Sequence, residues 1–362
     1  MRPNDETELA EMIRATEAPL RVQGGGTRGA LGPGAVLETG GLCGVRLYEP
    51  GALTLVAAAG TSLAEVEAVL AAEGQRLAFE VPDLRALLGR EGASTLGGVV
   101  AENAAGPRRV AVGAARDFLL GVAFVDGRGD LIRNGGRVMK NVTGYDLVKL
   151  MAGSRGQLGV LTEVALKVLP RPEAVVTLLL PGLDIGQAVA AMAAALGSPF
   201  EVTGAAHLPE AGTYLRLEGF AGSVAYRRDR LAALLRPFGL AEEVADPWGQ
   251  IRDVAPFAGR AGDVWRLHLR PSEAAGVVAR IGAEAVMLDW GGGLIWALME
   301  PGADLRARAG AFQGHALRLR GAADTAPLPP VLAGLSDGLR HQFDPRGIFA
   351  PSSTLAQTTA GN

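Results

Sequence analysis

Residues 135–170 read GGRVMKNVTGYDLVKLMAGSRGQLGVLTEVALKVLP, and this stretch decides the predicted fold. A strand-like run from Gln157 to Leu169 closes it. Glycine recurs before and within that run, at Gly144, Gly153, Gly156 and Gly159. Because glycine has no Cβ, such a chain can bring its backbone close to a ligand. The stretch therefore predicts a strand that begins beside a site for a flat or phosphorylated ligand.

A second glycine cluster, GGGTRG at residues 24–29, follows a short strand predicted at 20–23 and matches the pattern GxGxxG. In nicotinamide-binding folds this pattern opens a helix whose N-terminus receives the pyrophosphate. Here residues 30–34 read ALGPG, which cannot start a stable helix, so a nicotinamide site is disfavoured. A loop of successive N–H groups can still hold phosphates without a helix. The alternative is a plain glycine turn.

The third cluster is STLGGVVAENAAG at residues 94–106. Its small residues would let a flat ring lie against the backbone, and Ser94 and Thr95 could donate hydrogen bonds to ligand oxygens. The alternative is a close-packed turn between a helix and a strand, capped by the two hydroxyls. Several such clusters in one chain favour a ligand site over unrelated turns.

Size and composition indicate a globular chain of two domains. Its 362 residues exceed the length at which a single core stops growing, and 48% of them are hydrophobic. The net charge is −3, and the densest basic cluster, Arg227-Arg228-Asp229-Arg230, is typical of a solvated helix face, so no nucleic-acid partner is expected. The longest apolar run, 188–196, is too short to span a bilayer.

After Pro170-Arg171-Pro172 a new series of strands and helices begins and continues to a linker at 322–330. Helices separated by paired strands predict an antiparallel sheet with helices on one face. A last helix is expected at 331–343, followed by a turn. The single cysteine, Cys43, excludes an internal disulfide and an iron–sulfur cluster held by this chain alone.

The three glycine clusters together resemble the FAD-binding domain of the vanillyl-alcohol oxidase / p-cresol methylhydroxylase (PCMH-type) family. Gly153–Glu163 carries the run G-x-x-G-x-L-G-V-x-T-E, and the wording resembles the E subunits of bacterial glycolate oxidases. The resemblance implies an α+β fold: a PCMH-type FAD-binding domain of two α+β lobes at 1–170, with the cofactor between them. A cap domain of antiparallel sheet and helices would follow at 171–325. A C-terminal segment at 326–362 would pack back on the FAD-binding domain.

The resemblance also implies a set of cofactor-binding residues: Gln23, Gly24, Gly25, Gly26, Thr27, Arg28, Pro82, Ser94, Thr95, Gly97, Gly98, Asn103, Gly106, Lys140, Asn141, Gly153, Gly159 and Val160. Lys140 could stabilise negative charge on a reduced flavin, or be an ordinary surface lysine. Several family members tether flavin through a histidine in the N-terminal half. All four histidines here, His207, His268, His315 and His341, come after residue 200, so non-covalent FAD is expected and no metal site.

The implied function is a subunit of a glycolate oxidase complex that oxidises glycolate to glyoxylate, a CH–OH oxidation. The implied partners are a second flavin subunit, of D type, and an iron–sulfur subunit, of F type. Because the histidine-rich substrate stretch of related dehydrogenases is missing, we expect the partner flavin subunit to do the chemistry. This chain would relay electrons or support that partner, in the cytoplasm or at the inner face of the cell membrane.

Two alternatives stay open. One is a self-sufficient flavoenzyme that oxidises an alcohol or a 2-hydroxy acid. The other is a non-catalytic scaffold without flavin, in which Arg28, Arg108 and Arg109 would obstruct the groove. The same arginines could instead pair with the pyrophosphate, since guanidinium forks match phosphate oxygens.

Overall fold

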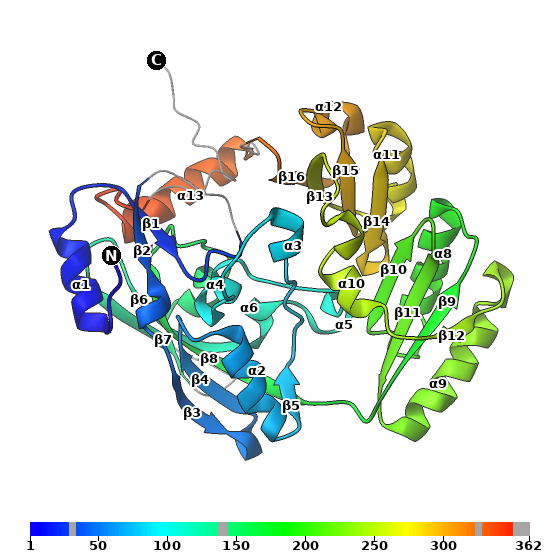
Figure 1. Cartoon of the computed structure of the whole chain (residues 1–362), viewed down its shortest axis with the longest axis horizontal. Coiled ribbons are helices and arrows are strands. Elements are labelled where there is room, and N and C mark those ends of the chain that lie inside the picture. Colours follow the sequence, from blue (N-terminus) through cyan, green and yellow to red (C-terminus); the bar gives the residue numbers. More distant parts are fainter. Residues whose placement is uncertain (29–33, 137–143, 323–327, 350–362) are drawn as a thin grey trace.

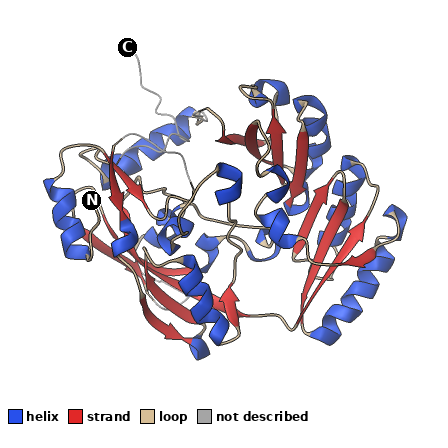
Figure 2. Cartoon of the chain, viewed as in Figure 1, coloured by secondary structure: helices blue, strands red, loops and turns tan. Residues whose placement is uncertain are grey.

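The computed structural model describes residues 1–28, 34–136, 144–322 and 328–349. Two large sheets lie side by side, with short helices between them (Figure 1). Figure 2 shows that longer helices cover the outer side of the second sheet. A small parallel pair stands apart, formed by β1 (Leu20–Gln23) and β2 (Ala35–Glu38).

The first sheet has six antiparallel strands in the order β3-β4-β8-β6-β7, with β5 paired to β8. Its strands are β3 (Val45–Glu49), β4 (Thr54–Ala58), β5 (Gln75–Leu77), β6 (Leu119–Val125), β7 (Leu131–Gly135) and β8 (Val160–Pro170). The helices of this part are α1 (Glu6–Ala15), α2 (Leu63–Ala72), α3 (Arg85–Leu88), α4 (Leu96–Ala101), α5 (Arg109–Val112), α6 (Ala115–Phe118) and α7 (Leu147–Met151). Strands β6 and β7 form an antiparallel hairpin.

Strand β8 is the long central strand, and the strand predicted from the opening stretch is confirmed in it. It pairs with β4, β6 and β5, so the residues just before it are fixed relative to all three. Helix α2 begins after Ser62, whose hydroxyl accepts from the Glu65 N–H, as an N-cap does. The apolar residues of α2, α4 and β8 form one core.

The second sheet has eight antiparallel strands in the order β12-β9-β11-β10-β14-β15-β13-β16. They are β9 (Ala174–Leu180), β10 (Gly204–Leu208), β11 (Gly212–Gly219), β12 (Glu242–Val244), β13 (Asp263–Leu269), β14 (Ala285–Asp289), β15 (Leu294–Met299) and β16 (Gly314–Arg320). The helices that follow Pro170 are α8 (Ile185–Leu196), α9 (Ala221–Leu234), α10 (Trp248–Arg252), α11 (Ala274–Ile281), α12 (Leu305–Ala309) and α13 (Pro330–Phe343).

The prediction that helices cover only one face of this sheet is wrong. Helices α8, α9 and α11 pack on one face, and α10 packs on the other together with Leu84 and Leu87 of the N-terminal part. Strand β15 is buried along its whole length, with alternate residues in the cores of the two faces. A strand that is apolar on both sides needs cover on both faces.

The C-terminal segment returns to the N-terminal part. The Phe343 ring lies 5.9 Å from that of Phe124, and the Leu20 N–H donates to the Ile348 carbonyl at 2.6 Å. Helix α13 turns an apolar stripe to solvent. Its exposed residues are Val331, Leu332, Leu335 and Leu339.

The basic cluster on α9 is only partly solvated. Arg228 pairs with Asp229 and Glu243 at the surface. Arg227 is buried, and its guanidinium donates to the carbonyl of Glu218 and pairs with Glu201. The expectation of a solvated face is therefore wrong for Arg227, because the helix turns that residue toward the sheet. Among the described residues, no helix combines the length and the apolar character that crossing a bilayer requires.

Candidate functional site

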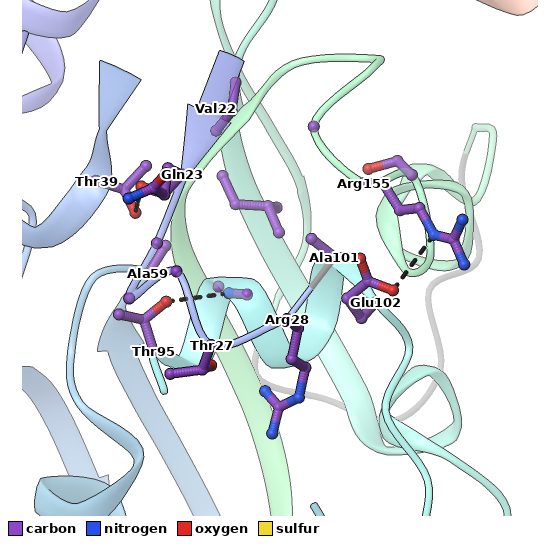
Figure 3. Close-up of a pocket in the computed structure, with 18 of the residues that line it drawn as sticks. Val22, Gln23, Thr27, Arg28, Thr39, Ala59, Thr95, Ala101, Glu102 and Arg155 are labelled. Atoms are coloured by element: carbon purple, nitrogen blue, oxygen red, sulfur yellow. Dashed lines mark hydrogen bonds and ion pairs between the residues drawn. The ribbon is translucent and has the colours of Figure 1, made fainter. Parts of the chain in front are cut away.

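Three glycine-rich segments meet around one cavity of about 900 Å³, its open mouth included (Figure 3). They are the loop after β1, the start of α4 and the turn that leads into β8. Three parts of the chain that are far apart in sequence thus form a single concave surface, which we call the first cavity.

The loop after β1 lies flat on residues 93–95. A Cβ on Gly24 would stand 2.2 Å from the Thr95 Oγ1, and one on Gly25 would stand 1.5 Å from the Ala93 carbonyl oxygen. Both distances are impossible for real side chains, so only glycine lets the two loops touch. The loop therefore forms the cavity wall with its backbone.

The wall is suited to an anion. Among the described residues, the backbone N–H groups of Gly25, Gly26 and Thr27 have no hydrogen-bond acceptor. Arg28 and Ser154 line the same cavity, and the Arg28 Nη1 and the Ser154 Oγ are buried without a partner in the described part of the chain. Burial lowers the pKa of Arg28. Unsatisfied buried donors are costly, and the phosphate oxygens of a cofactor such as FAD would satisfy them.

The two hydroxyl residues mainly hold the wall together. Thr95 is the N-cap of α4, and its Oγ1 accepts from the Gly98 N–H at 3.3 Å. The Ser94 Oγ lies 3.0 Å from the Thr27 Oγ1 and does not line the cavity. The interpretation of these hydroxyls as caps is confirmed for Thr95, which also lines the cavity.

The structure brings together most, but not all, of the predicted cofactor-binding residues. Those that line the first cavity are Gln23, Gly24, Gly25, Gly26, Thr27, Arg28, Thr95, Gly97, Gly98 and Gly159. Lys140 and Asn141 lie outside the described residues. Pro82 and Asn103 line a neighbouring cavity instead.

Three further predicted residues do not line either cavity. Gly106 lies at the seam with the second sheet, where its carbonyl accepts from the Trp290 Nε1 at 3.0 Å. Gly153 donates its N–H to the Val100 carbonyl at 3.1 Å. Val160 is fully buried in a core below the cavity floor. These positions shape the surroundings of the site and do not form its walls.

The neighbouring cavity, called the second cavity, shares Arg28, Glu102 and Arg155 with the first. Glu102 pairs with Arg155 at 3.3 Å, at the boundary between the two (Figure 3). The wall of the second cavity includes five arginines and one glutamate, with apolar residues between them: Arg28, Arg109, Arg155, Arg266, Arg318, Glu102, Leu84, Leu88 and Leu319. Its character is strongly cationic.

Arg266 of β13 and His268 form the inner end of this region. The Arg266 Nε donates to the His268 Nε2 at 2.8 Å, and the His268 ring lies 4.7 Å from that of His315 on β16. Burial and then the Arg266 charge lower the pKa of His268 to about 2. The ring is therefore neutral, and its Nε2 lone pair is already engaged. His341 is exposed and lines neither cavity.

Arg108 does not obstruct the first cavity. Its guanidinium is buried at the seam between the two sheets, 3.2 Å from Glu218 of β11, and Arg109 lines the second cavity only. The expectation that Arg108 lies near the glycine loops is wrong, because a buried carboxylate on the other side of the seam pairs with it. Among the described residues, no group of three or more His, Cys, Asp or Glu is arranged to hold a metal ion.

Sequence reasoning missed several lining residues. In the first cavity these are Arg21, Val22, Thr39, Ala59, Ala101, Glu102, Ser154, Arg155 and Leu161. Ser154 and Arg155 lie between Gly153 and Gly159, two predicted cofactor-binding residues, so their place in the sequence could have identified them. No such sequence signal exists for Arg266 of the second cavity, since it comes from a strand of the other sheet.

Comparison with known proteins agrees with this geometry. A family model described as "FAD binding domain" matches residues 1–135. The glycolate oxidase subunit GlcE of Escherichia coli (strain K12) is 38% identical over 358 residues, which cover 97% of this chain and 96% of that protein. The glycolate oxidase subunit GlcD of Bacillus subtilis (strain 168) is 46% identical over 86 residues, 24% of this chain and 18% of that one.

Among solved structures, an alkyldihydroxyacetonephosphate synthase has a TM-score of 0.72 at 16% identity, covering 99% of this chain and 77% of that one, and shares the fold. The FAD-binding family model and the near full-length likeness to GlcE point the same way. The chain belongs to the GlcE family, flavoproteins built on the PCMH-type FAD-binding fold.

Proposed function

We propose that this chain is the FAD-binding subunit of a glycolate oxidase complex, which oxidises glycolate to glyoxylate. The observation that carries the proposal is the 38% identity to a protein of that name across 97% of the chain. The proposed domain limits are 1–170 for FAD binding, 171–325 for the cap and 326–362 for the C-terminal segment. They are supported by the change of sheet between Pro170 and Ala174.

FAD, when bound, would supply a carrier that can take up electrons and pass them on. In this proposal the N–H groups of Gly25, Gly26 and Thr27 bind its pyrophosphate, and Arg28 neutralises phosphate charge. Gly97 and Gly98 leave room for the cofactor against the start of α4. Non-covalent binding is supported by the lining, since the described residues of the first cavity include no histidine, cysteine or tyrosine.

The proposed division of labour leaves substrate oxidation to a partner flavin subunit of D type. The support is local: His268 is neutral and its Nε2 accepts from Arg266, so it is poorly placed to take a proton from an alcohol. Electrons would leave the complex through an iron–sulfur subunit of F type. This chain then relays electrons or supports the catalytic partner.

The exposed apolar stripe of α13 supports a role as a subunit. Four large apolar side chains on one helix remain exposed by 40% to 75% of their surface. Such patches mark protein contacts more often than free surface. The proposed occupant is the D-type subunit.

The scaffold alternative predicts an obstructed groove, and the open first cavity counts against it. The self-sufficient enzyme differs in one testable respect, which is reduction of flavin by substrate in the isolated chain. To test the proposal, the chain is co-expressed with the D-type and F-type subunits of its own source and purified by a tag on the chain. We expect all three to co-purify and glycolate-dependent dye reduction to need all three. Full activity without this chain would overturn the proposal.

A further inference from the structure

Arg266 is a half-buried cation that has no counter-ion among the described residues. Its only hydrogen bond in the described part of the chain runs from Nε to a neutral histidine, and no carboxylate there lies within ion-pair distance. Arg266 lines the second cavity. Burial, followed by the charge of Arg155, lowers the pKa of Arg266 to about 10, so it remains charged at neutral pH. A half-buried charge of this kind is destabilising unless an anion joins it.

The surroundings leave more positive charge uncompensated. Two of the five arginines of the second cavity have carboxylate partners, Arg155 with Glu102 and Arg318 with Asp263. Arg109 is stacked over the Trp290 ring at 4.9 Å and has no carboxylate partner among the described residues. With Arg28 assigned to the FAD phosphate, Arg109 and Arg266 remain as two guanidinium groups without a carboxylate partner in the described lining of this cavity.

The rest of the wall limits what the anion can be. Leu84, Leu88 and Leu319 make one side apolar, and Asn103 carries the nearest neutral amide. The Asn103 Oδ1 already accepts from the Arg116 N–H at 2.9 Å. The guanidinium fork matches carboxylate and phosphate oxygens alike, but only an anion with a short carbon skeleton also gives the leucine side an apolar partner.

We propose that the second cavity is a binding site for a small monocarboxylate anion, held by the Arg266 guanidinium fork with Arg109 beside it. Because the His268 Nε2 already accepts from Arg266, we assign to this site the binding of the anion and not its oxidation. The site itself stands on these residues. That its natural occupant is the hydroxy acid or oxo acid of the reaction rests on the proposed function.

The test is titration of the purified full chain, loaded with FAD, in chloride-free buffer at constant ionic strength. The probes are acetate and glyoxylate, with inorganic phosphate as the comparison anion. Thermal melting and calorimetry report binding without any turnover. We expect both carboxylates to raise the melting temperature in a saturable way and phosphate to do so far less.

The decisive variant is Arg266→Gln, which removes the charge and keeps a hydrogen-bond donor. We expect at least about tenfold weaker carboxylate binding, because a charged hydrogen bond is lost. Arg109→Gln should weaken binding by a smaller factor. The matched control is Arg270→Gln, an exposed position directly after the same strand, which should bind like the parent.

Carboxylate binding that survives Arg266→Gln, or phosphate binding as tight as acetate, would overturn the assignment. If Arg266→Gln fails to fold, Arg109→Gln against Arg270→Gln decides the same question. FAD retention and co-purification with the partner subunits are measured on each variant. A parent chain that neither retains FAD nor co-purifies with the partner subunits refutes the proposed function. A parent chain that does both but binds no carboxylate refutes only this inference.

Discussion

Asp289 at the end of β14 offers the sharpest test of how the second sheet is buried. Its side chain is 2% exposed, and it accepts from the Trp290 N–H at 2.7 Å. Burial, and then the negative charge of Glu80, raise the pKa of Asp289 to about 7, while Arg216 and the Trp290 N–H oppose the shift. Replacing it by asparagine keeps the shape and the acceptor and removes the ionisation.

The sign follows from proton linkage. In the unfolded chain the carboxyl has a pKa of about 3.9, so between pH 4 and 7 the folded state holds more protons than the unfolded one. Folding stability from this group is therefore complete below about pH 4 and falls as the pH rises toward 7. Between pH 5 and 8 the loss amounts to about 2–3 kcal/mol, which the Asp289→Asn variant should not suffer.

Urea unfolding followed by tryptophan fluorescence at pH 5 and pH 8 measures the difference. We expect Asp289→Asn to exceed the parent in stability at pH 8 by more than at pH 5. The exposed Asp229→Asn change on α9 is the control and should follow the parent at both values. If the stability of Asp289→Asn changes between pH 5 and pH 8 by as much as that of the parent, the claim that burial raises the pKa of Asp289 is refuted.

Two further changes test the seam and the first cavity. Glu80→Gln should lower the free energy of unfolding in urea at pH 7 by about 3 kcal/mol. Glu80 pairs with the buried Arg216 guanidinium at 2.7 Å, so its loss leaves that charge unpaired. A loss below about 1 kcal/mol would mean that solvent reaches the pair. Gly97→Ala should lower FAD affinity at least about tenfold, because its Cβ would stand 2.8 Å from the Ala59 Cβ and would shift α4 at the cavity wall. Gly222→Ala, which meets no atom within 4 Å, should retain FAD like the parent, and equal affinity in all three chains would contradict the role of Gly97.

The local sequence predicts those helices and strands whose ends are marked by capping residues, glycine or proline. Helix α8 begins at a reciprocal capping box of Asp184 and Gln187, a start signal that the sequence itself carries. Strand β15 is a run of six consecutive apolar residues between Gly293 and Glu300-Pro301, a pattern that fits a buried strand. The glycine clusters identified the first cavity because each glycine permits a contact that no other residue allows.

Long-range features could not be predicted in the same way. The second cavity joins Arg28, Asn103, Arg266 and Arg318, which come from four distant segments, and no local pattern relates them. The burial of Arg227 depends on the neighbouring strand that supplies the Glu218 carbonyl. Gly106 belongs to the glycine cluster at 94–106 but lies at the seam between the two sheets, because its carbonyl accepts from the Trp290 Nε1. In each of these cases, contacts with segments distant in the sequence determine where the residue lies.

The most direct test of the account is the visible absorption spectrum of the chain purified alone, before and after anaerobic addition of glycolate. We expect an oxidised flavin spectrum, with the flavin released into the supernatant by acid precipitation, and no bleaching by glycolate. Colourless protein that does not take up added FAD would contradict the FAD site in the first cavity. Bleaching by glycolate would make this chain the catalyst and contradict the proposed division of labour.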